Sequence, residues 1–324
     1  MNKMQQKKCT FGSAFGAWLL AQQARNLTRN YLDLLGRTRD TWLQRWGDLE
    51  IESITADQVR GYLIWLAGKE ADGSVPAPKG NSGKPLSGAT VNIHYRGIKA
   101  FFHWLEDEDL ILKSPVRKVK APRADEKLPE ALTEVEVQDL LAKVKGSGDR
   151  NAWRDYCIHL FFCDTAVRLT ELASLDLAHL NFEEGYARVF GKGRKERLVP
   201  LGIELRRDLN KYLLKFREAE QTETALFTNE HGARLMPGGI RTMVVRDLKR
   251  YVPRKLAKCG PHTERHTAIT LKLRKTRDLK TTSLIAGHST TRTTERYIHL
   301  TGTDVLRDAG GSAMDDLVRG RKSV

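Results

Sequence analysis

The sequence predicts a mainly α-helical protein of two domains, with a small β-hairpin in the second domain. Apolar residues recur at helical spacing along most of the chain, and two Thr-x-x-Glu/Gln capping boxes precede such stretches. The segment Y-A-R-V-F-G-K-G-R-K-E-R-L-V-P-L alternates apolar and polar residues around a glycine-containing turn, as β-hairpins do. A charged segment with three prolines separates the two halves.

The first predicted domain, residues 10–113, is entirely helical. Its expected helices cover residues 11–25 and 29–46, a stretch after the capping box of Thr55 and Gln58, and residues 88–104. Residues 70–88 are rich in Gly, Pro and Ser and predict a loop. Residues 114–130 form a basic linker that we expect to be extended, either as a strap along a phosphate backbone or as a solvated tether.

The second predicted domain, residues 131–324, combines helices with the hairpin. The capping box of Thr133 and Glu136 begins its first helix. Further helices are expected over residues 151–164, 168–175, 203–220, 237–252, 261–275, 278–286 and 291–299, with a short strand over 225–228. Residues 302–324 predict a short helix and a frayed basic end.

The composition favours a polyanionic partner. The chain of 324 residues carries a formal net charge of +15, with a pI of about 9.7. Nucleic acid and an anionic membrane face both attract such a chain, and a basic protein without either partner is the plainer alternative. The four cysteines have no metal-ligand spacing, so we predict neither a metal site nor a disulfide framework.

A cytoplasmic location fits this use of cysteine. The N-terminal lysines and the apolar run after them resemble a secretory signal, but two glycines interrupt that run. We therefore expect no export and no membrane partner.

The most basic stretch lies between residues 241 and 277, where twelve Lys/Arg stand against Asp247 and Glu264. Such a field attracts phosphate. Cleaving a phosphodiester without a metal needs fixed cations at the non-bridging oxygens, a hydroxyl nucleophile and a proton donor for the departing oxygen. The chain has candidates for each task, with Glu171 in support: Arg168, Lys192, His262, Arg265, His288 and Tyr297.

Each candidate alone also has a plain structural interpretation. Arg168 can pair with Glu171 on the helix surface, Lys192 can be a solvated hairpin tip, and Tyr297 can be a core residue. Their order and spacing are specific as a set. An arginine in R-L-T-E-L, a lysine in G-K-G, then H-x-x-R-H, G-H-S and E-R-Y resemble the tyrosine recombinase family, which includes phage integrases. The resemblance covers roughly residues 10–300.

The resemblance implies a role for each motif residue. Tyr297 would attack the scissile phosphate to form a 3′-phosphotyrosine, with help from His262 in proton transfer. Lys192 would protonate the departing 5′ oxygen. The phosphate oxygens would be held by Arg168, Arg265 and His288, and Glu171 would support Arg168.

The resemblance also implies an architecture and partners. A helical core-binding domain and an α+β catalytic domain would form a C-shaped clamp around double-stranded DNA that carries inverted-repeat core sites. A homo-tetramer would join two duplexes through a Holliday junction, without ATP, metal or other cofactor. We expect a cytoplasmic, nucleoid-associated enzyme of a mobile element or a replicon, with accessory DNA-bending proteins as a further class of partner and no separate arm-binding domain.

Two positions depart from the family pattern. Ala166 and Val167 stand where the family has Gly-Leu, and we expect them only to shift packing. Glu264 stands where the family prefers leucine. A buried unpaired carboxylate is costly, so Glu264 must face solvent or find a basic partner.

Basic residues outside the motifs are candidates for DNA contact. The alternative for each is an ordinary solvated surface. The candidates are His94, Arg96, Lys99, Lys118, Lys120, Arg194, Lys195 and Arg241.

Two functions other than recombination are compatible with the sequence. One is a catalytically inert DNA-binding or architectural relative. The other is a nicking-closing enzyme or hairpin-forming resolvase that applies the same chemistry to one duplex.

Overall fold

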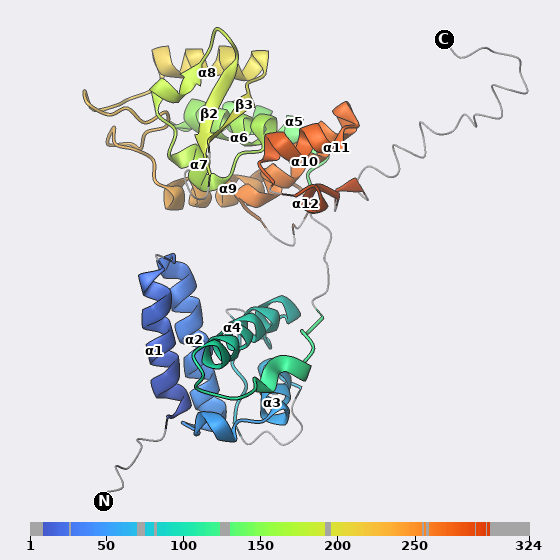
Figure 1. Cartoon of the computed structure of the whole chain (residues 1–324). Coiled ribbons are helices and arrows are strands. Elements are labelled where there is room, and N and C mark those ends of the chain that lie inside the picture. The colour runs from blue at the N-terminus through green and yellow to red at the C-terminus, as the bar shows by residue number, and fades with distance from the viewer. Residues whose placement is uncertain are drawn as a thin grey trace, which may run out of the picture. The chain divides into compact units, whose positions relative to one another are not determined.

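The computed structural model describes residues 9–298 except 26, 70–74, 81–82, 124–129, 192–195, 255, 257–258, 289 and 296. The chain divides into two compact units, Met1–Lys127 and Leu128–Val324 (Figure 1). Each unit has a large hydrophobic core of its own. Within the described ranges, no helix has both the length and the apolar content needed to cross a bilayer.

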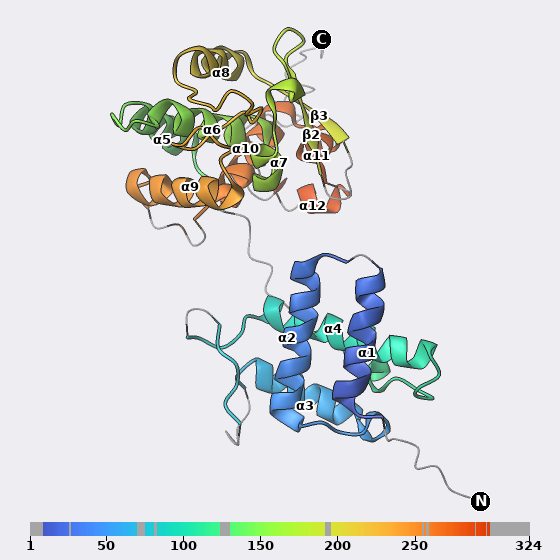
Figure 2. The same ribbon diagram turned by 90° about the vertical axis from the view of Figure 1, so that its left-hand side faces the viewer.

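The N-terminal unit is helical, as predicted. Its helices are α1 Phe11–Ala24, α2 Arg29–Trp46, α3 Ala56–Leu66 and α4 Gly88–Asp107, with 3-10 turns η1 Ile51–Ser53 and η2 Pro115–Lys118. The predicted capping box is confirmed: the Thr55 hydroxyl accepts from the backbone N–H of Gln58, whose side chain accepts from the N–H of Thr55. Helices α1 and α2 lie side by side and α4 packs across both (Figure 2).

Aromatic side chains fill the core of this unit. The rings of Phe11 and Trp42 stack at a centroid distance of 4.9 Å, and Phe101 lies 4.6 Å from Phe15. All four are fully buried. Because each aromatic side chain removes about 150–250 Å² from water, this cluster dominates the packing of α1, α2 and α4.

The C-terminal unit combines helices with one small sheet. Its elements are α5 Glu134–Lys145, α6 Ala152–Thr165, α7 Leu169–Ala173, η3 Leu177–His179, β1 Leu180–Asn181, β2 Tyr186–Phe190, β3 Glu196–Pro200, α8 Ile203–Lys215, α9 Pro237–Tyr251, α10 Pro261–Thr276, α11 Leu279–Ala286 and α12 Arg292–Glu295. The sheet is antiparallel in the order β1-β2-β3. Tyr186 pairs with Pro200 and Phe190 with Glu196, which confirms the predicted hairpin.

Some predicted boundaries are wrong. Helix α8 ends at Lys215, not at 220, because Phe216 leaves the helical region with φ −129°. Residues 225–228 form isolated bridges, Ala225 with Asp176 and Thr228 with Arg234, and not a strand. The linker, expected to be extended, begins with the 3-10 turn η2. The predicted helix in residues 302–324 lies outside the described residues.

Helix α10 is the central helix of the C-terminal unit. It packs against α6, α9 and α11 (Figure 1). Nine of its 16 residues are buried, so it is covered on more than one side. One side of α10 therefore meets α6, and another meets the segment from α11 to Tyr297.

Candidate active site

Arg168 is the N-terminal cap of α7, directly after a tight turn. Helix α6 ends at Ala166, whose φ of 57° and ψ of 26° lie in the left-handed region. The backbone N–H of Arg168 donates to Oε2 of Glu171 over 2.7 Å, and its Nη1 donates to Oε1 over 2.8 Å. Nη2 donates to the carbonyl of Gly287 over 2.9 Å. The Arg168 side chain remains 39% exposed, so the guanidinium can still meet a ligand.

Glu171 lies at the centre of the charged cluster. Its buried carboxylate also accepts two bonds from Arg197 on β3, Nη1 to Oε1 over 2.7 Å and Nη2 to Oε2 over 2.8 Å. Burial raises the pKa of Glu171, but the bonds from Arg197 and Arg168 outweigh burial and hold that pKa at about 2. Glu171 is therefore ionised, and each of its oxygens accepts two hydrogen bonds.

Arg265 reaches the same region from α10. Its buried guanidinium donates from Nη1 to the carbonyl of Ala166 and from Nη2 to the carbonyl of Ala286, the latter over 2.7 Å. Burial, with the nearby charge of Arg168, lowers the pKa of Arg265 to about 10, so it stays cationic at neutral pH. Ala286 precedes Gly287, so Arg265 and Arg168 bind adjacent carbonyls at the end of α11.

His288 follows this turn. Its Nδ1 lies 2.7 Å from the hydroxyl of Thr294. Burial, followed by the positive charges of Arg265 and Arg168, lowers the pKa of His288 to about 4. The imidazole is therefore neutral at physiological pH.

Tyr297 packs against the two turns that Arg265 binds. Its side chain is 3% exposed and belongs to a small apolar cluster with Ala166, Ala268, Ile269, Leu273 and Ala286. The phenol is hydrogen-bonded to Nδ1 of His266 on α10. His262, one turn earlier on α10, is exposed, and its ring centroid lies 6.4 Å from that of His266.

Five of the predicted site residues thus lie on or beside α7, α10 and the segment after α11. Lys192, Arg194 and Lys195 lie outside the described residues, between β2 and β3. Sequence analysis missed Arg197 and His266. Strand alternation puts Arg197 on the face of buried Val199, a signal that this arginine points inward. His266 stands four residues after His262, on the same helix face.

The prediction that His94 contacts DNA is wrong. His94 is buried on α4, where its Nδ1 lies 3.2 Å from the Thr38 hydroxyl and 3.4 Å from the Tyr62 hydroxyl. Burial lowers its pKa to about 4, so it is a neutral core residue. Arg96 and Lys99, on the same helix, are exposed and stay candidates.

The linker lysines line a groove of the N-terminal unit. Lys118 and Lys120 are exposed, and with Arg60, Lys69 and Arg123 they surround an apolar floor that includes residues of α3. The groove has a volume of about 820 Å³. Arg241, on α9 of the other unit, is also exposed. All three candidates are accessible to a phosphate backbone.

The two departures from the family pattern have different outcomes. Glu264 is fully buried and has found a basic partner, because its Oε1 is hydrogen-bonded to Nδ1 of His159 on α6. Burial raises the pKa of Glu264. Ala166 does more than shift packing, contrary to our expectation. Its left-handed backbone is a conformation that glycine adopts without strain and alanine does not.

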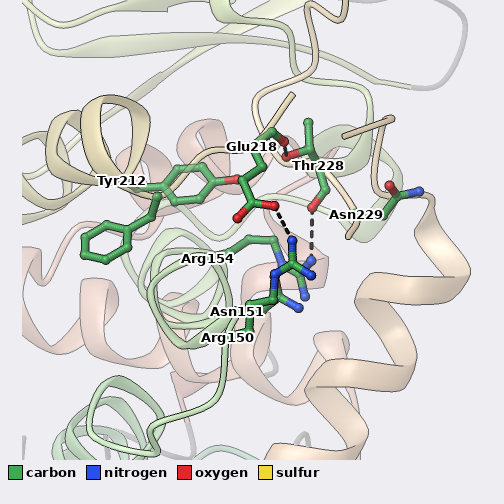
Figure 3. A pocket seen from close by; sticks show the side chains of 8 residues that line it. Arg150, Asn151, Arg154, Tyr212, Glu218, Thr228 and Asn229 are labelled. Atoms are coloured by element: carbon green, nitrogen blue, oxygen red, sulfur yellow. Dashed lines mark hydrogen bonds and ion pairs between the residues drawn. The ribbon is translucent and has the colours of Figure 1, made fainter. Parts of the chain in front are cut away.

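A second, smaller pocket of the C-terminal unit has no part of this cluster. It has a volume of about 20 Å³ and lies between Arg150, Arg154, Glu218 and Thr228 (Figure 3). The Arg150–Glu218 ion pair and a bond from Arg154 to the Thr228 carbonyl fill its polar side. Its size and its internal pairing leave no room for a substrate.

Comparison with known proteins agrees with this site. A family model described as the phage integrase family matches residues 130–303. Tyrosine recombinase XerD of Oceanobacillus iheyensis is 30% identical over 286 residues, which are 86% of this chain and 90% of that protein. Tyrosine recombinase XerC of Thermodesulfovibrio yellowstonii is 33% identical over 225 residues, 67% of this chain and 73% of that protein.

Solved structures share the fold. The Tn1549 transposon integrase, in complex with a circular intermediate DNA, matches with a TM-score of 0.71 and 19% identity over 89% of this chain and 94% of that one. The XerH site-specific recombinase bound to a palindromic difH substrate matches with a TM-score of 0.72 and 20% identity over 89% and 81%. The chain described here therefore belongs to the phage integrase family of tyrosine recombinases.

Proposed function

We propose that this protein is a site-specific DNA recombinase that cuts and rejoins strands through a covalent 3′-phosphotyrosine at Tyr297. One observation carries the proposal. Arg168 and Arg265 bind adjacent carbonyls of the turn that leads to His288, and Tyr297 packs against the same turn. Two fixed guanidinium groups, a neutral imidazole and a hydroxyl beside one another suit transfer of a phosphoryl group.

The proposed step exchanges one ester for another. The phenol oxygen of Tyr297 bonds to phosphorus, and the bond between phosphorus and the 5′ oxygen breaks. Nδ1 of His266 takes the phenolic proton, an assignment that rests on their hydrogen bond, and His262 assists. Lys192 gives a proton to the departing 5′ oxygen. Because the ester bond is retained, a 5′ hydroxyl of another strand can reverse the step without ATP, and fixed side-chain cations serve in place of a metal.

The phosphate would be held by charges of different kinds. Arg168 and Arg265 stay cationic and neutralise the non-bridging oxygens. The neutral His288 can accept from the Thr294 hydroxyl at Nδ1, which leaves its Nε2–H to donate to the phosphate. This tautomer assigns His288 to hydrogen bonding and not to proton transfer.

The proposed substrate is double-stranded DNA with inverted-repeat core sites. Residues 10–113 would form the core-binding domain, residues 131–324 the catalytic domain and residues 114–130 the strap between them. Four copies would hold two duplexes and exchange strands through a Holliday junction, with accessory DNA-bending proteins where the site needs them. The exposed cations Arg96, Lys99, Lys118, Lys120 and Arg241 would neutralise backbone phosphates.

A trapping experiment tests the chemistry and identifies the target site at the same time. A library of nicked duplexes with randomised inverted repeats loses the cleaved end by diffusion, so covalent protein–DNA adducts accumulate and their DNA can be sequenced. We expect adducts with the wild-type protein and none with Tyr297→Phe. The matched control, Tyr31→Phe on α2, should behave as the wild type, because Tyr31 is an exposed residue of the N-terminal unit.

The outcomes separate the alternatives. DNA binding without any wild-type adduct would identify an inert relative, and an adduct with Tyr297→Phe would refute the nucleophile. Intact duplexes that carry the recovered sequence should then yield Holliday junctions. Adducts without junctions would identify a nicking-closing or hairpin-forming enzyme.

A further inference from the structure

Arg197 connects three elements of the C-terminal unit. It stands on β3, and its guanidinium donates to both oxygens of Glu171 on α7, over 2.7 and 2.8 Å. Its Nε donates to the carbonyl of Ile285 on α11 over 3.2 Å. The Arg197 side chain is 16% exposed, and Glu171 is 1% exposed. Such a planar fork on a buried carboxylate fixes both partners in orientation.

Gly287 is shaped to the Arg197 guanidinium. A Cβ atom at Gly287 would lie 2.7 Å from Cζ of Arg197 and 2.8 Å from its Nε and Nη1, closer than atoms can approach. Gly287 also has a φ of +64°, which side chains disfavour. The guanidinium therefore lies directly against the turn whose carbonyl binds Arg168 and whose next residue is His288.

The sharing of Glu171 changes the charge that Arg168 presents. Glu171 alone would form a closed ion pair with Arg168 and neutralise it. With Arg197 on the same two oxygens, one carboxylate serves two cations, and a positive charge remains for a ligand. A buried carboxylate with four donors also has no lone pair left with which to draw Arg168 inward.

We propose that Arg197 is a positioning residue of the active site. It keeps Glu171 from neutralising Arg168, and it fixes the Gly287 turn that carries His288. This inference rests on the proposed function, because Arg168 and His288 are assigned there to the phosphate. Arg197 itself need not touch the substrate.

Two other roles are possible for an arginine at this position. Arg197 follows the segment with Lys192 by a few residues, so it could instead act by setting the leaving-group acid. It could also serve only to hold the sheet. A substrate that needs no leaving-group acid distinguishes the first role, and a separation of chemistry from binding distinguishes the second.

The test uses the full chain and the duplex recovered by trapping, with oxygen or sulfur at the bridging 5′ position of the scissile phosphate. A thiolate leaves without protonation, because a thiol is a far stronger acid than an alcohol. The adduct rate is measured in single turnover at saturating DNA, and the half-saturating DNA concentration is measured separately. The matched control is Arg188→Ala, a half-exposed arginine on β2 that pairs with Glu196 of the same sheet.

We expect Arg197→Ala to slow adduct formation about 100-fold on both substrates, with the half-saturating concentration changed by less than about threefold. Arg197→Lys, which keeps a charge but lacks the fork, should recover about tenfold of that loss. Arg188→Ala should match the wild type. If Arg197→Ala does not fold, Arg197→Lys decides, with an expected loss of about tenfold on both substrates.

Three results would overturn the inference. Wild-type rates in the deciding variant would show that Arg197 has no part in the chemistry. A defect confined to the oxygen substrate would assign Arg197 to the leaving-group acid, and a defect confined to half-saturation would assign it to binding. A wild-type protein that forms no adduct would instead refute the proposed function, so the two failures are distinguishable.

Discussion

Two charged clusters lie on different sides of α10, and they differ in balance. On the α11 side, Arg168, Arg197 and Arg265 share the single carboxylate of Glu171, and the remaining guanidinium bonds go to backbone carbonyls. On the α6 side, three cationic groups meet three carboxylates in one chain of contacts. In order along that chain these are Arg154, Asp155, Arg246, Asp247, His159 and Glu264.

The difference indicates what each cluster is for. A balanced buried network satisfies its own charges and offers little to a ligand, so it contributes position and stability. An excess of buried cations is unfavourable on its own and becomes favourable when an anion arrives. The α11 side is therefore the side that awaits a phosphate, and the α6 side is a support. The histidines follow the same rule: His288 is held neutral, whereas the pKa of His159 is raised to about 10.

The largest effect should come from removing a cation on the α11 side. Arg168→Ala should slow adduct formation by about 10²–10³-fold, because a charge that faces the developing phosphate charge is lost. Single-turnover trapping measures the rate, and thermal unfolding measures stability. A large fall in stability with an unchanged rate per folded molecule would contradict the functional assignment of this side.

The next effect concerns stability on the α6 side. Glu264→Leu introduces the residue that the family prefers but leaves Nδ1 of His159 without its partner. We expect the free energy of unfolding to fall by about 2 kcal/mol, the cost of an unsatisfied buried polar group. Urea unfolding checks this value. The adduct rate of the folded fraction should stay within a few-fold of the wild type, and a loss as large as that of Arg168→Ala would break the distinction between the two sides.

The pH dependence of stability gives a smaller effect with a definite sign. Burial lowers the pKa of His159, but Glu264 and Asp247 outweigh burial and raise it to about 10. His159 therefore stabilises the fold fully below its unfolded pKa of 6.5, and this contribution is lost as the pH rises through 10. Unfolding free energies measured from pH 7 to 10 should fall by at most about 1.4 kcal/mol per pH unit from this group.

The control for this pH dependence is the double variant His159→Leu/Glu264→Leu, which removes both members of the pair. Its stability should lack that slope. An equal slope in both proteins would show that another group titrates, and His159 would then be no more than a packed neutral residue.

The smallest effect should come from the left-handed turn between the clusters. Ala166→Gly should raise the free energy of unfolding by about 0.5–1 kcal/mol, because relief of the left-handed strain exceeds the entropy that glycine loses on folding. Thermal unfolding is the measurement. A lower melting temperature would mean that packing of the Ala166 methyl in the Tyr297 cluster outweighs the strain.

Much of this fold could be predicted from the sequence because its signals are local. The Thr55 and Thr133 capping boxes and the 186–200 alternation depend on residues a few positions apart, and the structure has all three. The strand β1 could not be predicted, because its two residues are too few to show a period.

Side-chain partners far apart in sequence were harder to predict. The inward turn of His94 and the fork of Arg197 on Glu171 depend on how helices and sheet pack, which no window of the sequence contains. Glu264 lies between these cases. Its need for a basic partner followed from burial energetics, but His159, 105 residues earlier, could be identified only in three dimensions.

The α6 network has a consequence for the evolutionary history of this chain. Glu264, His159 and Asp247 come from three separate helices, and each is acceptable in a dry interior only when the others are present. A lineage that acquired one of them alone would have carried a handicap until the rest followed. We therefore expect these three positions to covary among relatives, so that a glutamate in H-x-E-R marks a subgroup recognisable from genomes alone.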